Sequence, residues 1–297
     1  MYEHIVISGG GQSFFQTLGI FNELFKYDLI KKKEIKTIYS TSSGSIISIL
    51  ISINLEWSAI TKYFLERPWE KLFNVTLQEV YQVYANKGLY NIEHITKALK
   101  PLFDCADIPL DITLSDFYNL TEIEHHFFSF EVNAFEIKDI NYKTFPNLQL
   151  LEALQMTCAI PIFFSPVIKD NSCFIDGGVT SNYPIKFCLC DVSDHKTILG
   201  IRNLYDTKNN EVDIIKTSST TFDFLLSILL KLLKSMRKPY IKTSVYKEIE
   251  SHCMPVSMGR LHSCFQEESI RKELYTKGVE CVDCFINENH HNVVVKN

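Results

Sequence analysis

Three short turns in this sequence carry groups that could perform chemistry. The most informative one is Ser40-Thr41-Ser42-Ser43-Gly44, which lies between a strand-like and a helix-like segment. A serine nucleophile on such a turn needs small neighbours, because the backbone there is strained and other segments come close. The turn follows the pattern G-x-S-x-G, with Ser40 in the position of the first glycine. Ser42 is therefore the candidate nucleophile, and a serine-rich helix N-cap is the equally weighted alternative.

The second turn is Ser8-Gly9-Gly10-Gly11, again between a strand and a helix. Consecutive glycines let backbone N–H groups point outward together, and the following helix adds positive dipole at its start. Such a loop can hold a phosphate or stabilise the oxyanion of an acyl-transfer intermediate. A dinucleotide-binding loop is disfavoured, because Phe14 stands where that motif needs its last glycine. A tight connection with only a structural role is the alternative to an oxyanion loop.

The third turn is Asp176-Gly177-Gly178, directly after the strand-like run 172–175. An aspartate at the carboxyl end of a strand lies where open α/β sheets bind their ligands. An Asp-Gly hairpin turn is the alternative, but Asn182-Tyr183-Pro184 follows without a second clear strand. A serine hydroxyl is a poor nucleophile until a neighbouring group removes its proton, and an oriented carboxylate can do so. Asp176 is therefore the candidate base for Ser42.

The segments that position these turns predict an α/β fold with a mainly parallel sheet. Residues 3–8 and 36–40 read as strands, and residues 14–29 and 46–53 read as the helices that follow them. This alternation is the βαβ pattern, and we expect a three-layer α/β/α sandwich with helices on both faces of the sheet. All three turns would then lie at carboxyl ends of parallel strands, which converge on one edge.

The remaining chain predicts a single domain over residues 1–297. Its core motifs span 4–205, a helical insert occupies 55–120, and C-terminal helices occupy 218–285. Pro68, Pro101 and Pro109 are expected to separate the helices of the insert. We find no internal repeat and no Pro/Gly/Ser-rich linker, which favours one domain over two.

Composition limits the classes of function. The 297 residues are 46% hydrophobic and carry a formal net charge of −5, without the basic face that a nucleic-acid partner requires. Met1 is followed almost at once by a strand-like segment, which leaves no room for a signal peptide. The longest apolar stretch is too short to span a membrane, and nine scattered cysteines suit reduced thiols. We expect a cytoplasmic or peripheral membrane protein.

The ordered set of motifs resembles the patatin-like phospholipase family. Four segments carry the resemblance: Ser8-Gly9-Gly10-Gly11, Ser40-Thr41-Ser42-Ser43-Gly44, the run from Cys158 to Pro166, and Asp176-Gly177-Gly178 with Asn182-Tyr183-Pro184. The resemblance implies a serine–aspartate dyad of Ser42 and Asp176 without histidine, and an oxyanion hole formed by Gly9, Gly10 and Gly11. It also implies that no metal or other cofactor is needed. The implied substrate is a phospholipid or another acyl-ester lipid, reached through peripheral membrane contact.

Two positions depart from the family pattern. Family members usually carry Arg or Lys followed by Gly after the triple glycine, and here Ser13 and Phe14 stand there. We expect the missing cation to weaken support of the glycine loop, and Ser40 to crowd the elbow. These departures leave two alternatives to a lipid acyl hydrolase. One is a lipid-binding pseudoenzyme of the same fold, and the other is a non-lipid esterase or thioesterase with the same dyad.

Three further features of the sequence bear on its function. Residues 222–236 have helical apolar spacing and a basic end, which favours a core helix over a membrane-surface helix. Cys281 and Cys284 have metal-like spacing, but no second pair accompanies them and a structural zinc usually needs four ligands. Phe163 and Phe164, with apolar residues of the insert, are candidates for the wall of an acyl-chain pocket.

Overall fold

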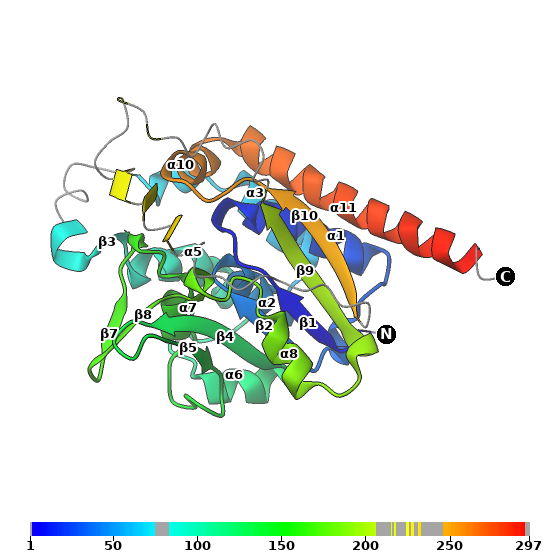
Figure 1. Cartoon of the computed structure of the whole chain (residues 1–297), viewed down its shortest axis with the longest axis horizontal. Coiled ribbons are helices and arrows are strands. Elements are labelled where there is room, and N and C mark those ends of the chain that lie inside the picture. The colour runs from blue at the N-terminus through cyan, green and yellow to red at the C-terminus, as the bar shows by residue number, and fades with distance from the viewer. Residues whose placement is uncertain are drawn as a thin grey trace.

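The computed structural model describes residues 2–74, 83–205 and 246–294, together with eight isolated residues between 215 and 232. Most of the helix predicted over 222–236, and residues 75–82 of the predicted insert, lie outside these ranges. Within them, the backbone forms a mixed sheet flanked by helices (Figure 1). None of the helices in the described part is long and apolar enough to cross a membrane.

The main sheet has the strand order β10-β9-β1-β2-β4-β8-β7, and β5 pairs with residues Phe127–Glu131 of β4. Its parallel strands are β1 (His4–Ile7), β2 (Thr37–Thr41), β4 (Glu124–Glu131), β9 (Ile198–Tyr205) and β10 (Lys247–Cys253). Its antiparallel strands are β5 (Glu136–Ile140), β7 (Val167–Lys169) and β8 (Ser172–Asp176). A separate parallel pair joins β3 (Gly88–Tyr90) to β6 (Ile162–Phe164).

The helices cover both faces of this sheet. They are α1 (Phe14–Lys26), α2 (Ser43–Ser52), α3 (Trp57–Glu66), α5 (Ile92–Cys105), α6 (Leu114–Thr121), α7 (Leu150–Cys158), α8 (Ile185–Asp191), α10 (Met258–Gln266) and α11 (Glu268–Val294). The side chains of β1 alternate: Ile5 and Ile7 join a large core with α1, α2 and α7, whereas Val6 joins a smaller core under α8. The predicted three-layer sandwich is confirmed.

One prediction about the sheet is wrong. Asp176 was expected at the carboxyl end of a parallel strand, but β8 runs antiparallel to β4. It still reaches the same edge, because β8 is short and shifted along its neighbour. Asp176 pairs with Ser129 of β4, one residue beyond Phe128, which pairs with Thr41 of β2. The end of β8 therefore lies level with the end of β2.

Pro101 does not separate two helices as predicted, because it lies inside α5. A proline within a helix cannot donate to the carbonyl four residues earlier, which is that of Lys97. Here the guanidinium of Arg67, just after α3, donates to the Lys97 oxygen at 3.1 Å and to the Ala98 oxygen at 3.1 Å. A side chain from outside the helix thus replaces the backbone donor, and the helix continues to Cys105.

The C-terminal helix α11 packs closely along α1. A Cβ atom on Gly278 would lie 1.9 Å from the Gln16 oxygen, and one on Gly19 would lie 2.2 Å from the Tyr275 oxygen. Both glycines are therefore required by backbone contact. Buried Arg271 ties the start of α11 to the chain by donating to carbonyl oxygens of Leu65, Arg67, Cys264 and Phe265. This helix extends the large core beyond the sheet.

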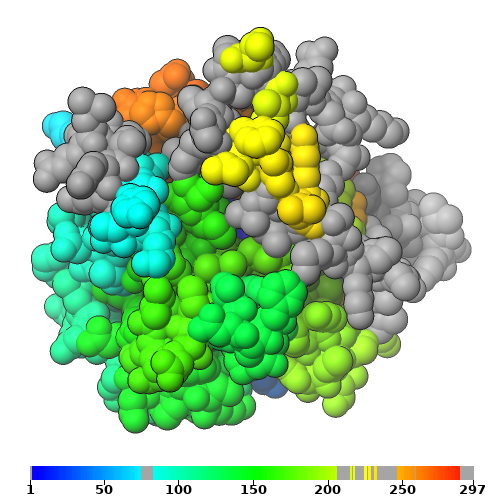
Figure 2. All heavy atoms as spheres, turned by 60° about the vertical axis from the view of Figure 1, so that its left-hand side comes forward, coloured from blue at the N-terminus to red at the C-terminus, as the bar shows by residue number. Residues whose placement is uncertain are grey.

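The arrows of β4, β9 and β10 point toward the left of Figure 1, so the carboxyl ends of the parallel strands face that side. Figure 2 turns this side toward the reader, and its described surface comes largely from segments coloured cyan to green. The three predicted turns must meet near this edge if they share a site.

Candidate active site

Ser42 sits on a strained turn between β2 and α2. Its φ is +54° and its ψ is −131°, a conformation that L residues rarely adopt and that is typical of a nucleophile elbow. Two contacts fix it: the Ser42 N–H donates to Thr157 Oγ1 at 2.9 Å, and the Ser42 carbonyl accepts from Ser45 N at 2.8 Å. Thr157 in turn donates to the Phe128 oxygen at 2.6 Å. Helix α7 and strand β4 thus hold the backbone strain at Ser42.

The elbow accommodates Ser40 without disturbance. Ser40 is fully buried, and its hydroxyl lies 3.4 Å from the His126 oxygen and 3.5 Å from Ser48 Oγ. The expectation that Ser40 crowds the elbow is wrong, because polar groups of β4 and α2 receive its hydroxyl. The close approach occurs instead at Gly44, where a Cβ atom would lie 2.7 Å from the Ser8 oxygen.

Asp176 is held at the end of β8 by backbone contacts on both sides. Its N–H donates to the Ala159 oxygen at 2.9 Å, and its Oδ1 accepts from Gly178 N at 2.6 Å. The side chain is buried, with 4% of the residue exposed. Gly177 lets this segment press against β4, because a Cβ atom there would lie 2.2 Å from the Phe128 oxygen.

The structure brings the three predicted turns together around Asn182. A Cβ atom on Gly9 would lie 2.8 Å from Ser42 Cβ and 2.9 Å from Asn182 Oδ1, so the glycine loop touches the elbow directly. One on Gly178 would lie 2.8 Å from both Asn182 Oδ1 and Asp176 Oδ1. The side chain of Asn182 therefore lies between the loop that carries Gly9 and the turn that carries Asp176.

The N–H groups of Gly9 and Gly10 face different partners. Gly9 N donates to the Asn182 oxygen at 3.0 Å, while Gly10 N donates to Ser43 Oγ at 3.1 Å. Gly11 has φ +54° and begins the 3-10 turn η1 (Gly11–Ser13) that leads into α1. Since Ser43 directly follows Ser42, the Gly10 N–H points toward the elbow, where an oxyanion would form next to the serine.

One of the two phenylalanines predicted to form the wall of an acyl-chain pocket lies in the hydrophobic core instead. Phe163 is buried, with 2% exposed, whereas Phe164 is half-buried and packs against Tyr90 of β3 with ring centroids 5.6 Å apart. Strand β3 belongs to the predicted insert and pairs with β6. Tyr90 is buried as well, with 4% exposed, so Phe164 remains the candidate for contact with an acyl chain.

Sequence reasoning assigned no role to Asn182, Thr157 or Ser43, which hold the loop and the elbow. Asn182 begins the motif Asn182-Tyr183-Pro184, and its place just after Asp176-Gly177-Gly178 was the signal that could have predicted a role in the site. Thr157 gave none and Ser43 gave only its small size within the elbow motif, because their hydrogen bonds depend on how α7 and the glycine loop pack against the elbow. In the described part of the chain, no group of three His, Cys, Asp or Glu residues could hold a metal ion.

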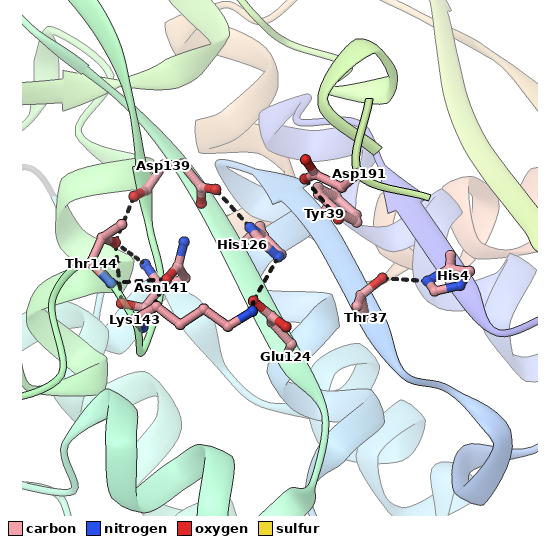
Figure 3. A network of polar contacts seen from close by, with 10 residues as sticks. All are labelled: His4, Thr37, Tyr39, Glu124, His126, Asp139, Asn141, Lys143, Thr144 and Asp191. Carbon is pink, nitrogen blue, oxygen red and sulfur yellow. Dashed lines mark hydrogen bonds and ion pairs between the residues drawn. The ribbon is translucent and has the colours of Figure 1, made fainter. Parts of the chain in front are cut away.

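A second polar cluster lies farther back along β2 and β4 (Figure 3). His126 Nδ1 lies 2.7 Å from Asp139 Oδ2, and its Nε2 lies 3.3 Å from Glu124 Oε1. Burial alone would lower the pKa of His126, but the hydrogen bonds to Asp139 and Glu124 outweigh it and raise that pKa to about 9. Tyr39 stacks on the His126 ring at 4.2 Å and donates to Asp191. The ring is therefore a buried cation with carboxylates on both sides.

The pattern of the patatin-like phospholipase family matches residues 5–189, which is more than half of the 297 residues. The chain belongs to this family. The match includes the elbow, the glycine loop and Asp176, and it ends before β9.

The chain is also similar to individual proteins, one of which is named as a lipid hydrolase. The chain is 30% identical over 190 residues to the protein named "Probable lipid hydrolase 463L" of Invertebrate iridescent virus 6, covering 63% of this chain and 63% of that protein. It is 26% identical over 238 residues to "Uncharacterized protein R571" of Acanthamoeba polyphaga mimivirus, covering 78% of this chain and 76% of that protein. The fold is similar to VipD from Legionella pneumophila, with a TM-score of 0.53 at 13% identity over 95% of this chain and 67% of that chain.

Proposed function

We propose that this protein is a lipid acyl hydrolase of the phospholipase A or lysophospholipase type, with Ser42 as nucleophile and Asp176 as general base. The observation that carries the proposal is the positive φ of Ser42, 54°, at a junction that the glycine loop touches directly. Strain at a non-glycine residue persists only where surrounding contacts enforce it, and here Thr157 does so. Family membership supports the lipid substrate.

The reaction follows from these positions in two steps. The Asp176 carboxylate takes the proton from the Ser42 hydroxyl while Oγ attacks the ester carbonyl carbon. The carbonyl electrons move onto oxygen, and the N–H groups of Gly10 and Gly11 stabilise that oxyanion. When the intermediate collapses, Asp176 returns its proton to the departing alcohol. Water, deprotonated by Asp176, then attacks the acyl-serine. As this second intermediate collapses, Asp176 returns that proton to Ser42 Oγ, and the fatty acid is released.

In this proposal Gly9 and Gly10 have different roles. Gly10 N already donates to Ser43 Oγ, so the substrate oxygen would replace that hydroxyl as the acceptor. Gly9 N donates to the Asn182 oxygen, so Gly9 supports the loop and does not donate to substrate. Gly9 also needs to be glycine because Ser42 Cβ lies so close to it.

The test compares wild type with Ser42→Ala and Asp176→Asn. Each is treated with a fluorophosphonate probe, and fatty-acid release is followed from mixed phospholipid vesicles. We expect wild type to label and release acid, and both activities to fall by roughly 10⁴-fold or more in the variants. Thermal unfolding of the three proteins checks that the variants are folded.

The outcomes separate this proposal from its alternatives. A folded wild type that binds vesicles without labelling or release contradicts the proposal and supports a lipid-binding pseudoenzyme. Labelling with turnover of a soluble short-chain ester or thioester, but not of vesicle lipid, supports a non-lipid esterase. Labelling that survives in Ser42→Ala would place the nucleophile elsewhere.

A further inference from the structure

The carbonyl oxygen of Gly9 accepts three side-chain hydrogen bonds. Asn182 Nδ2 donates to it at 2.9 Å, Asn203 Nδ2 at 3.0 Å and the Tyr205 hydroxyl at 3.0 Å. Asn203 and Tyr205 are next-but-one neighbours near the carboxyl end of β9. An amide oxygen has two lone pairs, so three donors on one carbonyl are more than ordinary satisfaction of a buried group requires.

The Asn203 amide is held in one orientation. Besides the Gly9 oxygen, its Nδ2 donates to Ser13 Oγ at 2.7 Å, and its Oδ1 lies 3.4 Å from Cys253 Sγ, whose single proton also faces the Ser251 oxygen at 3.4 Å. Burial raises the pKa of Cys253 to about 11, so the thiol keeps the proton that it donates. Cys253 pairs with Tyr205 in the parallel register of β10 and β9. The two acceptors of Nδ2, the Gly9 oxygen and Ser13 Oγ, thus fix which way the Asn203 amide points.

The same side chains enclose the next glycine. A Cβ atom on Gly10 would lie 2.0 Å from Ser13 Oγ, 2.6 Å from Asn203 Nδ2 and 3.0 Å from the Tyr205 hydroxyl. Position 13 brings no cation to this loop, and its hydroxyl instead accepts from Asn203. The expected loss of support at Ser13 is therefore offset by polar groups from β9.

The Gly9 oxygen and the Gly10 N–H belong to one peptide unit. Because that unit is planar and trans, the oxygen and the N–H point in opposite directions. Donors that fix the Gly9 oxygen therefore also fix the direction of the Gly10 N–H, which faces Ser43 Oγ next to the elbow. Hydrogen bonds to the oxygen also polarise the N–H and strengthen it as a donor.

We propose that Asn203 and Tyr205 are positioning residues that aim the Gly10 N–H at the oxyanion formed during acyl transfer. They act through the Gly9–Gly10 peptide and do not touch the substrate. The inference rests on the proposed serine hydrolase function. Both residues lie beyond the family match over 5–189, so this part of the chain completes a site whose reacting groups lie within that match.

The test uses Tyr205→Phe, which removes one hydroxyl, and Asn203→Leu, which removes two donated hydrogen bonds. Tyr205→Phe is expected to slow fluorophosphonate labelling about fivefold, as for the loss of one neutral hydrogen bond. Asn203→Leu is expected to slow it roughly 10²-fold, close to the loss of one oxyanion donor. The fall in ester hydrolysis should appear in kcat with KM nearly unchanged, because the oxyanion exists only in the transition state and intermediate.

A second measurement reports on the loop without activity. Hydrogen exchange of the Gly10 amide can be followed by NMR after ¹⁵N-glycine labelling, since the chain has only 11 glycines. We expect faster exchange at Gly10 in both variants. The matched control is Tyr63→Phe, which removes a hydroxyl bonded to the Ala98 oxygen at 2.6 Å, between α3 and α5. That control should leave labelling and Gly10 exchange unchanged.

The outcomes decide the inference separately from the function. Slower labelling and faster Gly10 exchange in the β9 variants, against an unchanged control, support the positioning role. Unchanged labelling and exchange in a folded Tyr205→Phe and Asn203→Leu overturn it. If wild type itself fails to label, the hydrolase proposal fails and the positioning role in catalysis is overturned with it, while Gly10 exchange still shows whether β9 supports the loop.

Discussion

The two halves of the strand pair β2 and β4 use buried polar groups in opposite ways. At the carboxyl end, Ser42 has a strained backbone and Asp176 is held by N–H groups of its own turn. Toward the amino end, the buried His126 ring has a carboxylate on each side and Tyr39 stacked on its face. In that half the charges compensate each other.

The two ends of this strand pair should therefore affect catalysis and stability differently. A compensated buried ion pair adds little net stability, because desolvation offsets its attraction, but removing one partner leaves the other charge buried and unpaired and is strongly destabilising. A strained residue costs stability and persists because neighbours hold it. Substitutions at the carboxyl end should therefore reduce catalysis more than folding, and substitutions at the His126 cluster should do the reverse.

Outside the proposed dyad and β9, Gly177→Ala should have the largest effect on activity. The new Cβ atom would lie 2.2 Å from the Phe128 oxygen, and a backbone atom cannot move aside cheaply. We expect Asp176 to shift and ester hydrolysis to fall by about 10²-fold, a factor that a displacement near 1 Å can cause. The matched control is Gly259→Ala in α10, where a Cβ atom meets nothing within 4 Å. Equal activity of the two variants would refute the tight contact.

His126→Leu should have the largest effect on stability at the other end. It leaves Asp139 without its buried cationic partner, and we expect a loss of about 3 kcal/mol in the free energy of unfolding. Urea denaturation measures this loss, and labelling of the folded fraction should be unchanged. The double variant His126→Leu with Asp139→Leu should recover part of the loss. A large fall in the labelling rate with little loss of stability would contradict the proposal that this cluster supports folding and not catalysis.

The pH dependence of stability sharpens the same contrast. His126 has a folded pKa of about 9 against an ordinary value of 6.5, so its contribution is complete below about 6.5 and is lost as pH rises through 9. Glu124 has a folded pKa of about 2 against 4.5, mainly through its hydrogen bond to His126, so its contribution is present above 4.5 and is lost as pH falls toward 2. Wild type should be most stable near pH 5–6 by urea titration. His126→Leu should show a weaker decline between pH 6.5 and 9.

Thr157→Val should have an intermediate effect at the catalytic end. Valine keeps the shape but leaves Ser42 N and the Phe128 oxygen without the Thr157 hydroxyl. We expect roughly tenfold slower fluorophosphonate labelling, and a stability loss of about 1–3 kcal/mol for the unsatisfied groups. Thr157→Ser retains the hydroxyl and should recover most of the labelling rate. Failure of serine to recover it would point to packing instead of hydrogen bonding.

Ser40→Gly should have the smallest effect. It restores the glycine of the elbow pattern, but the structure already accommodates the Ser40 hydroxyl beside Ser48 and the His126 oxygen. We expect activity within about twofold of wild type and a stability loss of about 0.5–1 kcal/mol from the glycine in a strand. A large gain in labelling rate would show that Ser40 does crowd the elbow.

Local features could be predicted because their cause is local. Strand β1, helix α1 and the turn at Ser42 follow from apolar periodicity and from small residues at adjacent positions. Pro101 misled the prediction for the opposite reason, because the donor that rescues its helix is Arg67, more than thirty residues away. The direction of β8 could not be predicted either, because a short strand carries no sequence signal for which way it pairs.

Residue types and their spacing along the chain were enough to predict the family, the layered fold and the three turns. The position of Asn182 between Gly9 and Asp176, and the hydrogen bonds from Asn203 and Tyr205 to the Gly9 oxygen, emerge only when the chain is folded. A hydrogen bond between residues nearly 200 positions apart depends on strand order and register, which local patterns do not specify. In this chain, the placement of β9 beside β1 creates that contact.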